Sequence, residues 1–126
     1  MPAAKKKKQT MDDLLGLVID ALQDKKAQHP VILDFRGLKG AVCDAFVLCH
    51  GNSMVQVEAI ADHVAAEVKK KTGFAPSHVE GLENAEWVLI DYFDIVIHVF
   101  QESKRKFYNL EQLWADAKIT EIATTE

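Results

Sequence analysis

The longest apolar run in the sequence extends from Trp87 to Phe100, and it limits the fold more than any other segment. Asp91, Asp94 and His98 interrupt this run, so it is too polar to cross a bilayer. Its valines and isoleucines favour β-strands over a helix. We therefore predict two adjacent strands, residues 86–93 and 95–101, which are separated near Asp94.

The first of these strands has two different faces, because successive side chains of a strand point to opposite sides. One face carries Val88, Ile90 and Tyr92, and the other carries Trp87, Leu89, Asp91 and Phe93. The first face is expected to pack on a core. The second combines large apolar groups with a carboxylate, which is typical of a partner-binding surface. The alternative is that helices cover both faces of the sheet.

Length and charge restrict the class of protein. A chain of 126 residues is long enough for one domain with one core. The net charge of −4 argues against a general nucleic-acid binder, although it leaves room for a local basic patch. The basic start is followed by Gln9, Thr10 and two aspartates instead of an apolar segment. No signal peptide is therefore predicted, and a cytoplasmic location is expected.

Both ends of the chain are predicted to lie outside the folded domain, which we place at residues 10–117. Residues 1–9 form a basic tail that is expected to be disordered, since its charges have no apolar residues beside them. The tail contains Lys5, Lys6, Lys7 and Lys8. These lysines are suited either to contact with RNA phosphate or to a solvated tail. Residues 118–126 have little to bury and are expected to be flexible.

Capping and periodicity predict the helices. The first should begin near Thr10 and be closed by Pro30. The second has the spacing of a capping box at Ser53 and Gln56, and Gly73 can end it. A third is predicted over residues 102–114, with an apolar stripe of Phe107, Leu110 and Trp114.

Short apolar segments at residues 31–35, 45–49 and 75–80 are expected to add three strands to the two described above. The order of helices and strands is typical of an α+β or mixed α/β domain. We predict a single mixed sheet of about five strands flanked by helices.

The Gly51-Asn52-Ser53 turn connects a predicted strand to the second helix. Free N–H groups at such a turn form an anion site in some proteins, which would suit a nucleotide phosphate. The capping role alone also accounts for Ser53.

No catalytic constellation is visible. Cys43 and Cys49 are predicted to be small buried side chains without a disulfide. The five histidines include no pair at metal-ligand spacing, and Asp91 and Asp94 would point to opposite faces of a regular strand. The residues alone therefore indicate a domain with no visible active site, and no metal or cofactor is predicted.

Several short motifs together resemble the ribosomal silencing factor family, also called RsfS or Iojap, over residues 11–114. The motifs are Leu33-Asp34, Arg36-Gly37, Gly51-Asn52-Ser53 with Gln56, Ile60-Ala61-Asp62, Val79-Glu80-Gly81, Trp87-Val88-Leu89, Asp91-Tyr92, Asp94, His98-Val99-Phe100, Phe107-Tyr108, Leu110-Glu111 and Leu113-Trp114. Each is weak alone, and their order and spacing are specific.

The resemblance implies a regulator and not an enzyme. It implies a fold similar to the nucleotidyltransferase fold without its catalytic carboxylates, and a homodimer when free. Such a factor binds ribosomal protein number fourteen on the large subunit and blocks joining of the small subunit. This represses translation when nutrients are scarce or guards immature large subunits.

The predicted contact surface is the Trp87 face of the strand with its surroundings. Its residues are Trp87, Leu89, Asp91 and Phe93, with Tyr92, Asp94 and His98 as neighbours and Arg105 and Tyr108 farther away. The chain departs from the family pattern at Phe93 and Ala85, where glycines are usual, at Ala45, where tyrosine is common, and at His50, where a small residue is usual.

Two other functions remain open from the residues alone. One is a nucleotide-binding or nucleotidyltransferase-like domain that uses the Gly51-Asn52-Ser53 turn. The other is an RNA-binding module led by the lysine tail.

Overall fold

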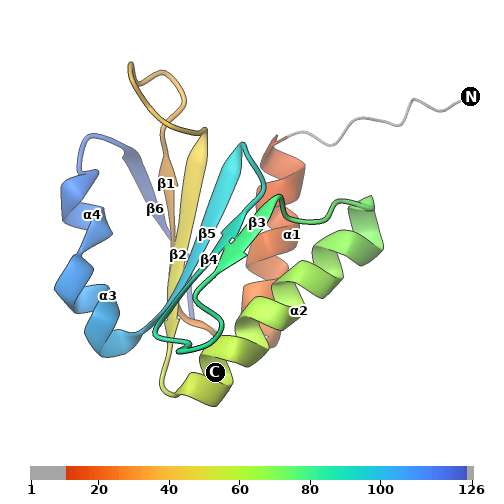
Figure 1. The fold of residues 1–126 in the computed structure, drawn as a ribbon. Helices are drawn as coiled ribbons and strands as arrows, with labels where there is room; N and C mark the ends of the chain where they lie inside the picture. The colour runs from red at the N-terminus through yellow and green to blue at the C-terminus, as the bar shows by residue number, and fades with distance from the viewer. Residues whose placement is uncertain (1–10, 125–126) are drawn as a thin grey trace, which may run out of the picture.

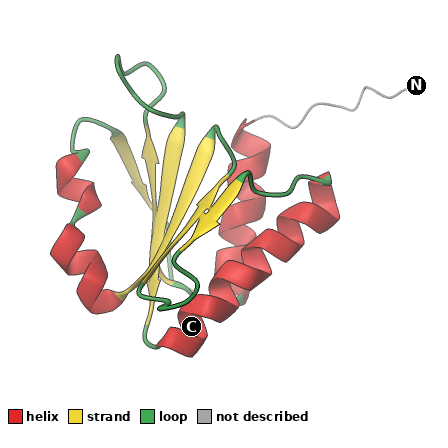
Figure 2. Cartoon of the chain, viewed as in Figure 1, coloured by secondary structure: helices red, strands yellow, loops and turns green. Residues whose placement is uncertain are grey.

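The computed structural model describes residues 11–124, which form one mixed β-sheet between two layers of helices (Figures 1 and 2). The predicted basic tail of residues 1–9 lies outside the described residues. The elements in chain order are α1 (Met11–Asp24), β1 (Gln28–Asp34), β2 (Ala45–Gly51), α2 (Met54–Thr72), β3 (His78–Glu80), β4 (Trp87–Asp91), β5 (Ile95–Gln101), α3 (Glu102–Tyr108), α4 (Leu110–Leu113) and β6 (Lys118–Glu121). None of the described helices is long and apolar enough to span a membrane.

The six strands lie in the order β3-β4-β5-β2-β1-β6. Only β2 and β5 run parallel, at the centre of the sheet, and the other neighbours are antiparallel. The central pair is connected through α2, β3 and β4. The prediction of a single mixed sheet flanked by helices is confirmed, with one strand more than expected.

Helices α1 and α2 cover one face of the sheet, and α3 and α4 lie against the other (Figure 1). The larger core lies under α1 and α2 and includes Val88 and Ile90 of β4. The smaller core lies under α3 and α4 and is rich in aromatic side chains, among them Phe35 and Phe100. Because α3 and α4 pack mainly over the central strands, Trp87, Leu89 and Asp91 of β4 stay only partly buried.

The second helix follows its prediction closely. The Ser53 hydroxyl accepts a hydrogen bond from the Gln56 N–H, and the Gln56 side chain accepts one from the Asn52 N–H at 2.7 Å. Gly73 ends α2 in the left-handed conformation (φ 82°), and its N–H donates to the Lys69 carbonyl. The capping chemistry therefore sets both ends of this helix.

The first helix ends earlier than predicted, because Pro30 belongs to β1 and does not close α1. The chain turns after Asp24, with Lys26 at φ 57°. The pairing of β1 with β2 is irregular between Gln28 and Val31, around the proline. A proline is tolerated at such an irregularity, since it has no N–H to donate to a neighbouring strand.

The predicted third helix is also wrong, because it is broken into α3 and α4. Asn109 adopts the left-handed conformation (φ 48°) between them, and its N–H donates to the Arg105 carbonyl. Asparagine enters this conformation more easily than most residues. The break turns Phe107 outward, and only Leu110 of the predicted stripe is fully buried.

The C-terminal segment is not a flexible tail throughout. Lys118–Glu121 forms β6, which pairs antiparallel with β1 at the edge of the sheet. The Ile122 N–H donates to the Pro30 carbonyl, and the Thr124 hydroxyl accepts from the His29 N–H. The strand predicted at residues 75–80 is shorter than expected and comprises only His78–Glu80.

Candidate binding surface

Trp87 stands at the start of β4, where it meets aromatic side chains from β5 and α3. It pairs with Phe100 across the two antiparallel strands, and the two rings stack with their centroids 5.1 Å apart. The ring centroids of Trp87 and Tyr108 are 4.6 Å apart. Helix α3 follows β5 directly, so the fold brings Tyr108 back over the strand that precedes it.

A hydrogen bond fixes the polar edge of the indole. Trp87 Nε1–H donates to His98 Nδ1 at 3.0 Å. His98 pairs with Leu89 across β4 and β5, which places it diagonally next to Trp87 on the same face. It is only 3% exposed and packs against Phe46, with ring centroids 4.4 Å apart. His98 is therefore a support beneath the surface and not a surface contact.

The protonation state of His98 follows from its surroundings. Because Nδ1 accepts a hydrogen bond, a neutral ring carries its proton on Nε2. The Nε2 atom is buried and has no hydrogen-bond partner among the described residues. Burial lowers the pKa of His98 to about 4. The imidazole is thus neutral at ordinary pH.

The structure places Trp87, Leu89 and Asp91 on the same partly buried face of β4, as strand alternation predicts. Trp87 and Asp91 stand at the two ends of the strand, about 13 Å apart at the strand rise of ~3.3 Å per residue. Tyr108 contacts Trp87, and Phe93 lies beyond the far end, in the turn to β5. The predicted row of contacts therefore runs from Trp87 to Asp91 and does not continue along the strand to Phe93.

Phe93 lies in the tight turn between β4 and β5 and not on the strand. It adopts φ 70°, is 76% exposed, and its N–H donates to the Asp91 carboxylate at 2.7 Å. Asp94 is exposed in the same turn, and its carbonyl accepts from the Asp44 and Ala45 N–H groups. Phe93 also lines a cavity of about 520 Å³ together with Phe74 and the first turn of α1.

Tyr92 belongs to the core under α1 and α2 and does not reach the surface that carries Trp87. Its hydroxyl is buried without a hydrogen-bond partner among the described residues, and burial raises the pKa of Tyr92 to about 12. The expectation from strand alternation that Tyr92 shares a face with Val88 and Ile90 is thus confirmed.

Phe93→Gly is expected to raise the free energy of unfolding by about 0.5–1 kcal/mol, measured by urea denaturation. An L-residue pays roughly 1–2 kcal/mol in the left-handed conformation, and the greater flexibility of glycine in the unfolded chain offsets part of that gain. Phe93→Ala is the control, since it removes the phenyl group and keeps the strained Cβ. An equal gain in both variants would show that the ring, and not the backbone, causes the strain.

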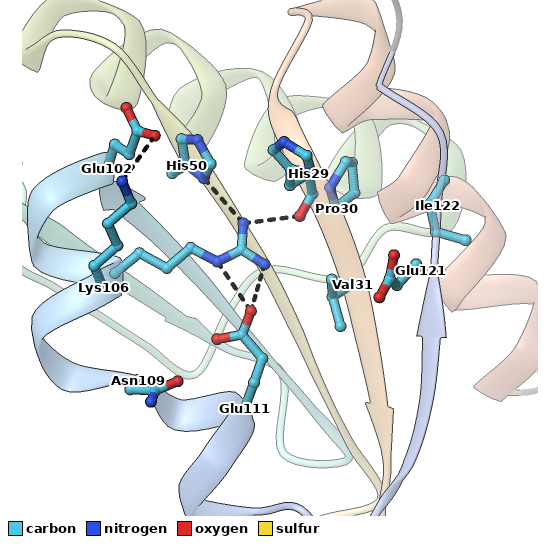
Figure 3. A pocket seen from close by; sticks show the side chains of 11 residues that line it. His29, Pro30, Val31, His50, Glu102, Lys106, Asn109, Glu111, Glu121 and Ile122 are labelled. Atoms are coloured by element: carbon cyan, nitrogen blue, oxygen red, sulfur yellow. Dashed lines mark hydrogen bonds and ion pairs between the residues drawn. The ribbon is translucent and has the colours of Figure 1, made fainter.

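Arg105 is buried and takes no part in the surface. Its guanidinium donates to the Glu111 carboxylate at 2.7 and 3.2 Å, to the His29 carbonyl at 2.8 Å and to His50 Nδ1 at 3.0 Å. Figure 3 shows Glu111 on one side of this group and His29 and His50 on the other. A cavity of about 350 Å³ lies beside them. The prediction of Arg105 as a distant contact residue is not supported, because its donors tie α3 and α4 to the start of β1.

Arg105→Met is expected to lower the free energy of unfolding by about 2 kcal/mol in urea denaturation, since several charge-assisted hydrogen bonds are lost together. Lys106→Met is the matched control, because it removes the same charge from the neighbouring residue, whose side chain is largely exposed. The control should stay within about 0.5 kcal/mol of the wild type. Equal losses would mean that net charge, and not the buried network, is responsible.

Phe107 was not predicted as a surface residue, and it is 77% exposed. Its ring lies 5.1 Å from that of Tyr108, edge to face, and Tyr108 in turn contacts Trp87. The three side chains form a row that we call the aromatic row: Trp87, Tyr108 and Phe107. The only sequence signal for the aromatic row is Asn109. Asn109 ends α3, so Phe107 does not share one continuous apolar stripe with Leu110 and Trp114.

The Gly51-Asn52-Ser53 turn caps the N-terminus of α2. The Gln56 side chain accepts a hydrogen bond from the Asn52 N–H, and the Ser53 hydroxyl accepts one from the Gln56 N–H. A Cβ on Gly51 would come within 3.1 Å of the Gln56 side chain, so glycine here makes room for the cap. Within residues 11–124, no cluster of three His, Cys, Asp or Glu side chains is arranged to hold a metal. Nothing in this geometry favours a nucleotide site.

Comparison with known proteins finds a family model and relatives that carry the same family name. Residues 8–126 match the family model RsfS, "Ribosomal silencing factor during starvation". The chain is 46% identical over 110 residues to "Ribosomal silencing factor RsfS" of Halalkalibacterium halodurans, covering 87% of this chain and 92% of the relative. It is 39% identical over 109 residues to the protein of the same name in Bacillus subtilis, covering 86% and 91%.

A solved structure resembles the fold closely. The crystal structure of a Chromobacterium violaceum protein superimposes with a TM-score of 0.80 at 33% sequence identity, covering 85% of this chain and 88% of that one. The agreement extends over most of both chains, so the architecture described above is shared.

Proposed function

The chain belongs to the ribosomal silencing factor family, and from this premise we propose that it binds the large ribosomal subunit through ribosomal protein number fourteen. Bound there, the domain occupies surface that the small subunit needs, so the subunits do not join. The effect is steric, and no bond is made or broken. The family name describes a regulatory role and not a catalysed reaction.

The observation that carries the choice of surface is the aromatic row. Tyr108 is 45% exposed and Phe107 is more exposed still, while Trp87 is partly buried and contacts both Phe100 and Tyr108. Partly desolvated aromatic side chains of this kind are typical centres of protein interfaces. Leu89 and Asp91 continue the same face of β4, where the helices leave the sheet partly uncovered.

The remaining predicted contacts take a peripheral place in this proposal. Asp91, Phe93 and Asp94 lie at the far end of β4, where they would meet the rim of the interface. The lysines of residues 5–8 would add a weaker, salt-sensitive contact with ribosomal RNA. Deleting residues 1–9 should then reduce the salt dependence of binding to large subunits, and binding itself should persist.

Sedimentation of the purified protein with isolated large subunits tests the proposal. The protein should pellet with the large subunits, and adding small subunits should yield fewer joined ribosomes than in its absence. Binding to isolated ribosomal protein number fourteen, measured in parallel, tests the named partner. Failure to pellet would overturn the proposed function, and pelleting without binding to the isolated protein would overturn the partner.

The free protein is proposed to be cytoplasmic and a homodimer. Sedimentation equilibrium of the protein alone measures its oligomeric state, and the same experiment with large subunits present shows whether the dimer persists on binding.

A further inference from the structure

His98 is a polar side chain whose position is unfavourable for folding by itself. It is 3% exposed among aromatic rings, and its Nε2 has no hydrogen-bond partner among the described residues. A buried donor without a partner costs free energy, whereas an apolar side chain of similar size would not. The one hydrogen bond that His98 makes with its side chain among the described residues is the bond that Nδ1 accepts from Trp87.

Stacking alone does not set the orientation of the Trp87 indole. The rings of Phe100 and Tyr108 contact the indole through apolar surface, and such contacts are less directional than a hydrogen bond. The bond to His98 Nδ1 forms only when Nε1–H is directed at that atom. His98 therefore selects the indole orientation.

We infer that His98 is a positioning residue, whose Nδ1 holds the Trp87 indole in the orientation that the ribosomal partner recognises. This inference rests on the proposed function, because it assumes that Trp87 lies in the contact. It assigns His98 to binding and not to stability, so the two properties should respond to its substitution in opposite directions.

His98→Leu separates these properties. It removes the acceptor together with the unpaired Nε2 donor, and it leaves an apolar side chain among apolar neighbours. We expect an unchanged or higher melting temperature and a loss of about tenfold in affinity for large subunits, since a hydrogen bond at an interface centre is worth about that factor. His98→Asn is the conservative variant, because its amide oxygen can accept at the position of Nδ1. It should restore most of the affinity.

A double-substitution cycle tests whether His98 acts through Trp87. Trp87→Phe keeps the stacked ring and lacks the N–H donor. If His98 acts by holding that donor, His98→Leu should weaken binding in the wild-type chain and add little in the Trp87→Phe chain. Additive losses would overturn the inference.

The indole resonance gives a second readout that needs no ribosome. In a nitrogen–proton correlation spectrum the Trp87 indole N–H, assigned by its loss in Trp87→Phe, should exchange slowly with water in the wild type and in His98→Asn. It should exchange faster in His98→Leu. Unchanged exchange in His98→Leu would overturn the inference.

The outcomes keep this inference and the proposed function distinguishable. If the wild-type chain does not bind large subunits, the proposed function fails and the inference falls with it. If the wild type binds and His98→Leu binds equally well, only the inference fails. A large drop in the melting temperature of His98→Leu without rescue of binding by His98→Asn would also overturn it, since His98 would then be structural.

Discussion

Trp87→Ala is expected to weaken binding to the large ribosomal subunit by about 100-fold, or about 3 kcal/mol, as for an aromatic side chain at the centre of an interface. The substitution removes the middle of the proposed contact surface and the indole ring that Tyr108 contacts. Titration of labelled protein against large subunits measures the loss directly. A change of less than threefold would remove Trp87 from the interface.

The same substitution will also cost stability, because Trp87 is partly buried against Phe100. We expect a loss of about 2 kcal/mol, below the range for fully buried tryptophans. Trp114→Ala is the matched control. Trp114 is also partly buried, packs on Phe35 with ring centroids 5.1 Å apart, and lies outside the proposed contact. It should cost similar stability and leave binding intact. Equal losses of binding would mean that unfolding causes both.

Acid is expected to destabilise the protein by about 3 kcal/mol between pH 6.5 and 4, because His98 is neutral in the folded state. Burial lowers the pKa of His98 from 6.5 to about 4. Above pH 6.5 the ring is neutral in both states. Between these two pKa values the unfolded chain takes up a proton that the folded chain does not. The free energy of unfolding therefore falls by about 1.4 kcal/mol for each unit by which the pH is lowered.

Urea denaturation at several pH values measures this slope, and His98→Leu should remove most of it. Burial also lowers the pKa of His50, with Arg105 adding to the effect, so a smaller slope of the same sign should remain in that variant. The pKa of Asp34 is lowered as well, by its hydrogen bond from Arg36, and this contribution is lost only below the ordinary value of 3.8. An identical slope in the wild type and in His98→Leu would contradict the assignment to His98.

The sequence predicts the elements whose evidence is local. Strand β5 has the predicted bounds, and alternation along β4 correctly separates Val88 and Ile90 from Trp87 and Leu89. The caps of α2 were visible in Ser53, Gln56 and Gly73 because capping depends on residues within one turn of the helix. The same alternation left open whether helices cover the Trp87 face, and the structure shows that face only partly buried.

The features that the sequence does not reveal depend on distant partners. Strand β6 has four exposed residues and no apolar alternation, and pairing with β1 alone holds it in the sheet. Arg105 stands between two lysines, and a run of basic residues of this kind predicts a solvent-exposed helix face. Its partner Glu111 is six residues away, a spacing that does not meet on a continuous helix, and the break at Asn109 brings the two together.

Two residues stand where the ribosomal silencing factor family usually has glycine, and both have an unexpected backbone conformation. Both departures from glycine, Ala85 and Phe93, have positive φ values, 50° and 70°. Ala85 is buried and its N–H donates to the Gly81 carbonyl, so its conformation is fixed by the surrounding fold. Phe93 is 76% exposed, so burial of its ring does not offset the strain of its turn.

The pairing of β6 with β1 links the beginning of the domain to its end during synthesis. The residues of β1 emerge early, yet their outer edge has no partner until Lys118–Glu121 has been made. An open strand edge is prone to pair with other chains, and contacts of long sequence separation form late. The sheet is therefore completed only after every element between β1 and β6 has been made, and until then the outer edge of β1 stays open to pairing with other chains.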